Sequence, residues 1–404
     1  MEILKASLPM WQAVYARVAL GLALVTLPCV MKAQAPTNYS LAWSDNFAGT
    51  PLSSGGVTLD TSKWWWRMGF TSDGSQQAVN VNLDGAGNLD LANTLKVVGS
   101  TTHYYGGGVI SHETSRYGYY QVTAQTPANT SEYHTAFWLS GAANLVSWNP
   151  SPSEVFTEID GFEINSTTPS SISAGWLTWS GAGSTLIASA RCNGNYNPGF
   201  NTSSGRHTYG IEWTEAAITY YIDGTSFCTQ AYTPTQGAAS PANMWLTSIP
   251  YGATGTPTAG AQAVFAAPEY YVRDYYVNAE DTGYAEYGSN WATSGVAGFS
   301  QQPVRDTCTA GQYATYTPNL LSSGSYDVQV YQIIYSGGTD SATVVTVNTS
   351  TGPVVLPVGT LPTSGSSRWI DLGTYSFNAG NTSSVSLQDG NNCLRTSMVK
   401  FVRQ

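Results

Sequence analysis

Short runs of alternating apolar and polar residues, separated by Gly, Pro, Asn and Ser, fill the chain from residue 41 to residue 278. Two examples are 118–124 (GYYQVTA) and 218–222 (ITYYI), the second of which is closed by Asp223 and Gly224. A period of two is the pattern of a half-buried β-strand, and Asp-Gly favours the turn of a hairpin. No stretch shows the sustained 3.6-residue period and the capping residues of a helix. Many short strands over such a length predict a β-sandwich or barrel.

A second strand-rich unit follows a seam near residues 280–283. Its alternating runs include 324–331 (GSYDVQVY) and 342–347 (ATVVTV). A segment of this size is long enough for an independent domain. The chain is therefore expected to be all-β, with one domain over 36–280 and a smaller β-sandwich over 284–404.

The first 35 residues have the pattern of a signal peptide. Lys5 and Arg17 precede an apolar run over residues 18–31, and small residues follow at Ala33 and Ala35. The alternative is a membrane anchor, but the run is short for a bilayer span. We therefore expect a secreted protein, extracellular or periplasmic, without a membrane segment once the signal is removed.

The composition excludes one class of partner. Only 10% of the residues are charged and the formal net charge is −10, whereas nucleic-acid binding needs a basic surface. A strongly sulfated or uronic polymer would also meet an unfavourable long-range field, although a few local arginines can override it.

Four cysteines remain beyond the signal segment and allow three disulfide connectivities. The economical pairing stays within each domain and joins Cys192 to Cys228 and Cys308 to Cys393. Disulfides persist in an oxidising compartment, which agrees with export. The alternative, buried free thiols, remains open at this point.

Residues 157–165 (TEIDGFEIN) place three carboxyl groups within six residues of an otherwise apolar strand. Side chains alternate along a strand, so Glu158 and Asp160 share one face and Glu163 has the opposite parity. A β-bulge at Gly161–Phe162 adds one residue and returns Glu163 to the face of the other two. The sequence therefore predicts a bulge between Asp160 and Glu163.

Three carboxyl groups on one face repel one another when ionised, so at least one pKa is raised beside an ionised partner. Retaining glycosidases use this division between two carboxyls about 5–5.5 Å apart. A solvated strand face or a calcium site is the alternative. Apolar neighbours such as Ile159 and Phe162 make an exposed face the weaker interpretation.

Residues 158–163 (EIDGFE) resemble the E-x-D-x-x-E signature of glycoside hydrolase family 16, which includes laminarinases, agarases and carrageenases. The resemblance extends from residue 41 to residue 278, in the order that this family shows. The further matching segments are 43–47 (WSDNF), 59–64 (LDTSKW), 106–119 (GGGVISHETSRYGY), 136–139 (AFWL) and 207–224 (HTYGIEWTEAAITYYIDG).

This resemblance implies a concanavalin A-like jelly-roll sandwich with a substrate cleft across its concave face. It assigns Glu158 as nucleophile, Asp160 as the helper between the acids, and Glu163 as acid/base. Residues 311–331 and the closing 397–402 (SMVKFV) are similar to the golvesin/xanthan-lyase carbohydrate-binding-like domain. That similarity implies an accessory module that tethers the enzyme to polymer, with a purely structural appendage as the alternative.

Some positions depart from the family pattern and bear on the substrate. Asn46 replaces a Glu in the opening motif, and Trp179 ends a segment in which many relatives have His. The Trp-Pro-x-Ser-Gly run that precedes the first Glu in laminarinases is absent.

Aromatic side chains are the expected sugar platforms, because the face of a pyranose ring is apolar and stacks on an indole. For each of them, packing in the core is the alternative interpretation. The candidate substrate-binding residues are Trp138, Trp148, Trp176, Trp179 and His134, the last as a hydrogen-bonding partner of a sugar hydroxyl.

The leading hypothesis is a secreted, retaining endo-glycoside hydrolase of a β-linked glucan or galactan such as laminarin or agar. A transglycosylase would use the same residues, and an inactive lectin-like protein would share the sandwich. A polysaccharide lyase is disfavoured by the carboxyl triad. We expect a monomer whose partner is a polysaccharide and which requires no cofactor, with Asp45 and Asp274 as candidates for a structural calcium site.

Overall fold

The computed structural model describes residues 35–37, 39–53, 56–67, 74–141, 155–180, 185–192, 194–233, 241–279, 281–299 and 302–404. Nearly all the regular structure in these residues is β-strand, and a short 3-10 turn, η1, lies at Ala78–Asn80. The predicted all-β class is confirmed.

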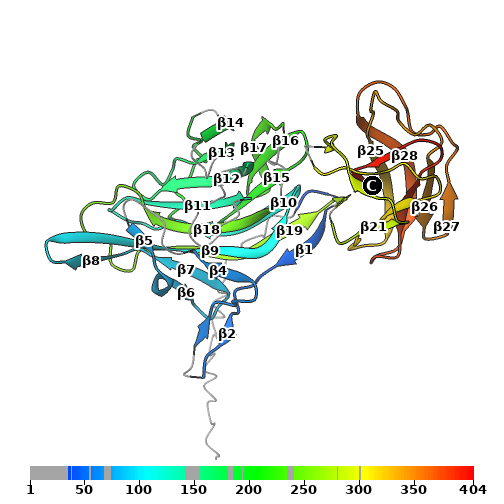
Figure 1. Cartoon of the computed structure of the whole chain (residues 1–404). Helices are drawn as coiled ribbons and strands as arrows, with labels where there is room; N and C mark the ends of the chain where they lie inside the picture. Colours follow the sequence, from blue (N-terminus) through cyan, green and yellow to red (C-terminus); the bar gives the residue numbers. More distant parts are fainter. Residues whose placement is uncertain are drawn as a thin grey trace, which may run out of the picture. The chain divides into compact units, whose positions relative to one another are not determined.

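One sheet of the first sandwich carries the carboxyl motif, and Figure 1 shows its strands side by side. Its spatial order is β14 (Thr185–Arg191), β13 (Ser173–Ser180), β12 (Val155–Asn165), β11 (Tyr133–Ser140), β18 (Ala242–Pro250), β9 (Thr101–Ser115) and β4 (Trp64–Trp66). Two further strands, β5 (Gly74–Gln76) and β8 (Thr94–Val98), pair with β9 outside this path. The motif strand β12 therefore has a paired neighbour on each side.

A second sheet packs against the first. Its order is β17 (Thr225–Ala231), β16 (Ala217–Ile222), β15 (His207–Trp213), β10 (Gly118–Gln125), β19 (Gln262–Val272), β7 (Asn88–Ala92) and β6 (Val81–Leu83), and β1 (Ser40–Ser44) pairs with β19. A separate two-stranded ribbon joins β2 (Thr50–Pro51) to β3 (Val57–Thr58).

Aromatic and aliphatic side chains from both sheets fill the space between them. The ring of Phe162 in β12 lies 4.4 Å from that of Tyr209 in β15 and 6.4 Å from that of Phe265 in β19, measured between centroids. Phe162 and Tyr209 are at most 1% exposed, so the contact is fully inside the sandwich. This packing fixes which face of β12 points inward and which face points to the cleft.

The disulfide between Cys192 and Cys228 confirms the first predicted pairing. Cys192 directly follows β14, at an edge of the first sheet, and Cys228 lies in β17, at an edge of the second. The bridge therefore joins the two sheets along one side of the sandwich.

The second sandwich is built from shorter sheets. A four-stranded sheet has the order β20 (Asp274–Asn278), β31 (Met398–Arg403), β25 (Gly324–Gln332) and β28 (Arg368–Phe377). A five-stranded sheet has the order β21 (Tyr284–Tyr287), β24 (Tyr313–Tyr316), β29 (Ser384–Gln388), β26 (Val344–Thr349) and β27 (Gly352–Val355). A small sheet joins β22 (Ala292–Thr293), β23 (Arg305–Thr307) and β30 (Leu394–Thr396).

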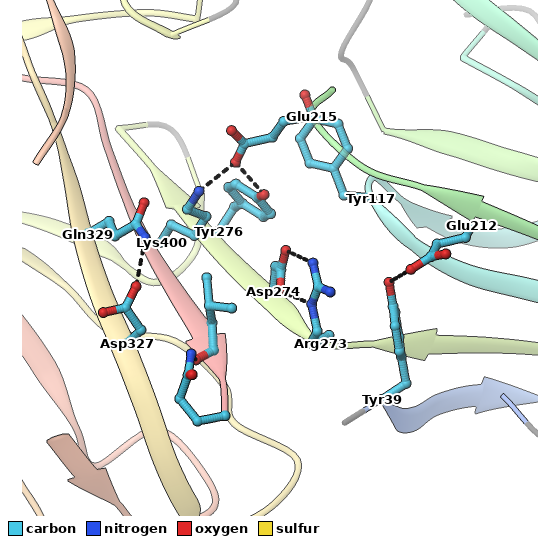
Figure 2. A network of polar contacts seen from close by, with 12 residues as sticks. Tyr39, Tyr117, Glu212, Glu215, Arg273, Asp274, Tyr276, Asp327, Gln329 and Lys400 are labelled. Atoms are coloured by element: carbon cyan, nitrogen blue, oxygen red, sulfur yellow. Dashed lines mark hydrogen bonds and ion pairs between the residues drawn. The ribbon is translucent and has the colours of Figure 1, made fainter. Parts of the chain in front are cut away.

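The second predicted disulfide, Cys308–Cys393, is also confirmed and lies between β23 and β30 of the small sheet. The four-stranded sheet takes its first strand, β20, from residues that precede the seam expected near residue 280, because β20 pairs with β31. Only Arg273 separates β19 from β20, and its guanidinium binds the Asp274 carboxylate at 2.7 Å (Figure 2).

The expected signal peptide covers residues 1–35, and all but the last of these lie outside the described residues. Within the described ranges, no helical segment has the length and hydropathy that a membrane crossing requires.

Candidate active site

The predicted bulge lies in the middle of β12. Along its pairing with β11, Phe137 is opposite Phe162 while the next residue, Trp138, is opposite Asp160, so Gly161 is the extra residue. The register with β13 shifts over the same interval, between Asp160 and Glu163. The bulge prediction is confirmed, and it turns Glu163 to the same face as Glu158 and Asp160.

Gly161 is required at the bulge because the strand runs against the core there. A Cβ on Gly161 would lie 2.7 Å from Cδ1 of Ile211 and 2.9 Å from Cδ1 of Phe137, closer than packed carbon atoms approach. Gly161 and Phe162 are therefore two consecutive buried residues on the inner side of β12. This pair shifts the alternation of side chains between the two faces of the strand by one position.

A cavity of about 310 Å³ opens over the three carboxyl groups and is lined by side chains from several strands. Glu158, Asp160 and Glu163 all contribute to its wall. The alternative of a solvated strand face fails, because Asp160 is only 2% exposed and its two partners are partly buried. The motif forms the floor of a cleft.

Glu158 is held by an indole and faces a buried cation. Trp179 Nε1 donates a hydrogen bond to Glu158 Oε2 at 3.0 Å. Burial and then the charge of Glu163 raise the pKa of Glu158 to about 7, although Trp179 and the charge of Arg67 oppose the change. A carboxyl with this pKa is divided between its two protonation states near neutral pH.

Asp160 is the most buried of the three acids. Burial raises its pKa well above the usual value, and the charges of Glu163 and Glu158 raise it further. Arg191 is the nearest cation, with Nη2 3.8 Å from Asp160 Oδ2, and its opposing effect is too small to reverse the shift. Asp160 therefore holds its proton to a higher pH than an ordinary aspartic acid.

Glu163 has the opposite environment. His134 Nε2 lies 3.0 Å from Oε1, Arg191 Nη1 donates to Oε2 at 2.9 Å, and Ser173 donates to the same oxygen at 3.4 Å. Burial alone would raise the pKa of Glu163, but the hydrogen bonds and charges of His134 and Arg191 outweigh it and lower the pKa to about 2. Glu163 is thus the ionised member of the triad, whereas Glu158 and Asp160 hold their protons to higher pH.

This division differs from the sequence expectation in one respect. The sequence predicts a raised pKa for the acid/base, which the family resemblance assigns to Glu163, whereas the structure lowers the pKa of that carboxyl. The physical reason is that His134 and Arg191 belong to β11 and β14, and only the assembled sheet brings them to Glu163.

The predicted aromatic residues do not all reach the cleft. Trp138 and Trp179 line it, and Trp138 Nε1 donates to Thr247 Oγ1 at 3.2 Å. Trp176 instead points into the core, because it is opposite the inward-facing Ile159 while the cleft face of β13 carries Leu177 and Trp179. Its indole donates to the backbone oxygen of Ala231 at 3.0 Å.

Trp176 is therefore removed from the substrate-binding set, since strand alternation buries it. Trp148 lies outside the described residues. His134 is in the cleft wall, but both of its ring nitrogens contact protein side chains, Asn165 Oδ1 at 2.9 Å and Glu163 Oε1 at 3.0 Å.

Residues in or beside the cleft that the sequence analysis did not select include Arg67, Arg191 and Tyr251. Arg67 is 4% exposed, and its guanidinium lies 5.2 Å from the ring centroids of both Trp138 and Trp245. Burial lowers the pKa of Arg67 to about 9, against the effect of Glu158. Tyr251 is 58% exposed at the rim, with its ring 5.4 Å from that of His134. Because charged residues are scarce in this chain, Arg67 and Arg191 could have been selected from the sequence as candidate site residues. This signal does not apply to Tyr251.

The two candidate calcium ligands are already engaged by other groups. Asp45 accepts hydrogen bonds from Trp64 Nε1 at 2.6 Å and from the backbone N–H of Phe47 at 3.1 Å. Asp274 is paired with Arg273. Neither carboxylate, as placed, fits a calcium ion, which needs several oxygen ligands directed at one point.

Comparison with known proteins agrees with this site. Residues 63–262 match the family Glycosyl hydrolases family 16, and residues 275–403 match the Golvesin C-terminal domain. The first of these matches is to a family of carbohydrate-active enzymes, the glycoside hydrolases. The first sandwich is therefore similar to glycosyl hydrolases family 16, over 200 of the chain's 404 residues.

Among characterised proteins, the chain is similar to the endo-1,3-1,4-beta-glycanase EglC of Rhizobium meliloti, with 25% identity over 260 residues. The match covers 59% of this chain and 52% of that protein, so the chain spans about half the length of this relative.

Two solved structures show low similarity. Porphyranase B from Zobellia galactanivorans has 17% identity and a TM-score of 0.45, over 58% of this chain and 92% of that chain. The laminarinase catalytic domain from Thermotoga maritima has 16% identity and a TM-score of 0.43, over 58% of this chain and 98% of that chain.

Proposed function

We propose that this protein is a retaining, endo-acting glycoside hydrolase that cleaves a β-linked glucan or galactan by double displacement. The observation that carries the proposal is the bulge in β12, which gathers Glu158, Asp160 and Glu163 on the floor of one cleft. The match to a family of glycoside hydrolases supports the reaction class.

In the first step, Glu158 attacks the anomeric carbon and Glu163 protonates the leaving oxygen, so that a glycosyl-enzyme forms. Asp160 supports Glu158, because a protonated Asp160 places its proton beside that carboxylate and stabilises it before the attack. Trp179 fixes the orientation of Glu158 through its indole N–H.

In the second step, ionised Glu163 takes a proton from water as the water attacks the anomeric carbon and Glu158 leaves. The hydrogen bonds from His134 and Arg191 favour this ionised form. The configuration at the anomeric carbon is inverted twice and therefore retained.

A β-glucan is the first substrate to test, because EglC, the characterised relative, is an endo-1,3-1,4-beta-glycanase. Trp138 and Trp179 on the cleft wall present apolar surface to a sugar ring. The C-terminal domain is proposed to hold the enzyme on polymer, which raises the local substrate concentration without altering the chemistry.

The test is release of reducing ends from laminarin, lichenan, agarose, porphyran and carrageenan, with product size followed by gel filtration. An endo-acting enzyme shortens one of these polymers rapidly before small sugars accumulate. Release from none of them by folded protein, together with binding to one, would support a lectin-like protein and contradict the proposal.

A further inference from the structure

His134 lies in a chain of hydrogen bonds that ends on the acid/base. In the pairing of β11 with β12, His134 is directly opposite Asn165, which is two residues after Glu163 and therefore on the same face of the strand. The imidazole lies between the two side chains, with Nδ1 2.9 Å from Asn165 Oδ1 and Nε2 3.0 Å from Glu163 Oε1.

The partners of the ring decide where its protons lie. An amide oxygen only accepts hydrogen bonds, so Nδ1 of His134 must carry a proton and donate it to Asn165. Nε2 then has no proton in the neutral ring and carries one only in the imidazolium. Across the 3.0 Å contact, the proton belongs either to Nε2, facing a carboxylate, or to Oε1, facing a neutral ring.

We infer that His134 is a positioning residue that carries the proton for Glu163, with the Nε2–Oε1 hydrogen bond as the path of transfer. This inference rests on the proposed function, since it requires Glu163 to be the acid/base. The imidazolium would supply the proton that Glu163 gives to the leaving oxygen in the first step. Without such a source, the contacts around Glu163 keep that carboxyl ionised.

The steps balance with one mobile proton. As the glycosidic C–O bond breaks, the proton on Nε2 of His134 passes to Oε1 of Glu163 and on to the leaving oxygen, and His134 becomes neutral. When water attacks the glycosyl-enzyme, its proton passes to Oε1 and on to Nε2, and the imidazolium is restored. Glu163 ends each step as a carboxylate, which its contacts favour.

The charged groups around the pair support this arrangement. Glu163 faces Arg191 from β14 and Asp160 and Glu158 from its own strand, while Glu132 acts on His134 from a distance. Burial lowers the pKa of His134, but the hydrogen bond and charge of Glu163 outweigh it, so the pKa is raised above 6.5. The imidazolium therefore persists to higher pH than it does in an unperturbed histidine.

The first test compares His134→Gln with His103→Gln, which changes an exposed histidine of β9. A glutamine amide can still donate to Glu163 but cannot carry a proton. The rate of aryl release in the first turnover is measured against pH, with aryl β-oligoglycosides of the cleaved polymer that differ in leaving-group pKa.

For His134→Gln we expect the first-step rate at pH 7 to fall by about 10-fold or more with poor leaving groups and by less than about 2-fold with good ones. The alkaline limb of the profile of rate against pH moves to lower pH, because no imidazolium remains to supply Glu163 with a proton. An equal loss with all leaving groups and an unmoved alkaline limb would overturn the inference. His103→Gln should behave as the wild type.

A second test begins with the unaltered active site. In wild-type protein labelled with ¹⁵N-histidine, the signals of His134 should show Nδ1 protonated throughout and Nε2 titrating above pH 6.5, and Glu163→Gln should lower that midpoint. A neutral ring with its proton on Nε2 would overturn the inference. If Glu163→Gln slows good and poor leaving groups equally, the proposed function itself fails, whatever His134→Gln does.

Discussion

Two groups of buried carboxyl side chains in this chain differ in what holds them. In the cleft, Glu158 and Glu163 are hydrogen bonded by the side chains of Trp179, His134 and Arg191. In the second sandwich, Asp340 and Asp389 are each 2% exposed, and Asp340 lies close enough to affect the ionisation of Asp389.

Asp340 is held mainly by the backbone. Its oxygens accept the N–H groups of Ala342, Gly390 and Asn391 at 2.9–3.1 Å and the hydroxyl of Thr343 at 2.8 Å. Burial would raise the pKa of Asp340, but these donors lower it. Backbone donors cannot leave without unfolding the loops that carry them, so this carboxylate serves structure.

The difference between side-chain and backbone donors distinguishes a catalytic carboxyl group from a structural one. Donors from side chains can exchange partners or pass on a proton, and the cleft acids combine them with an open cavity. Donors from the backbone fix one charge state. Four substitutions test this comparison, in order of decreasing expected effect.

Glu158→Gln should have the largest effect, because an amide is not a nucleophile. Turnover on every substrate should fall by a factor on the order of 10⁴ or more, and no glycosyl-enzyme should form. The measurement is mass spectrometry of enzyme quenched during turnover. Glu212→Gln, on the opposite sheet, is the matched control, and a similar loss there would mean that the assay reports folding.

Glu163→Gln should have a smaller effect that depends on the leaving group. Substrates with very good leaving groups need little protonation, so the first step should survive while the second slows for lack of a base. Azide should restore turnover and give a β-glycosyl azide, identified by NMR. An α-glycosyl azide from this variant would exchange the roles of Glu158 and Glu163.

Asp160→Asn should reduce turnover less than either change, because both essential groups remain. Protonated Asp160 stabilises the Glu158 carboxylate through its hydrogen bond, and an asparagine amide is a weaker donor, so the acid limb of the rate profile should move to higher pH than in the wild type. The check is kcat/KM against pH, and an acid limb that does not move would argue against coupling between the two groups.

Asp389→Asn should alter stability alone. Burial, followed by the charge of Asp340, raises the pKa of Asp389 to about 6, so folding favours the protonated form. That contribution is complete below the unfolded pKa near 3.8 and is lost as the pH rises through about 6. The Tm of the wild type, relative to the variant, should therefore fall between pH 4 and pH 7. A constant difference, or any change in kcat, would contradict the structural role.

The sequence predicted what depends on local pattern. Parity along β12 required the bulge between Asp160 and Glu163, and the economical pairing of cysteines was correct for both disulfides. Residue parity also indicates that Trp176 and Trp179 face opposite sides of the sheet, because they lie three positions apart on a regular strand. Only one of the two could therefore face the cleft.

The rest depends on strand order. His134 and Arg191 are 29 and 28 residues from Glu163, and nothing in their own segments indicates that β11 and β14 bring them to one carboxylate. Arg67 reaches Trp138 and Trp245 only through the order of strands β11, β18 and β9. The lowered pKa of Glu163, which follows from His134 and Arg191, could therefore not be predicted from the sequence.

The most direct test of the account is the stereochemistry of the first product, followed by ¹H NMR during rapid hydrolysis of a susceptible β-linked oligosaccharide by the wild-type enzyme. Double displacement through Glu158 and Glu163 predicts that the β-anomer of the new reducing end forms first and then mutarotates. Initial appearance of the α-anomer would mean a single displacement by water and would contradict the assignment of Glu158 as the nucleophile.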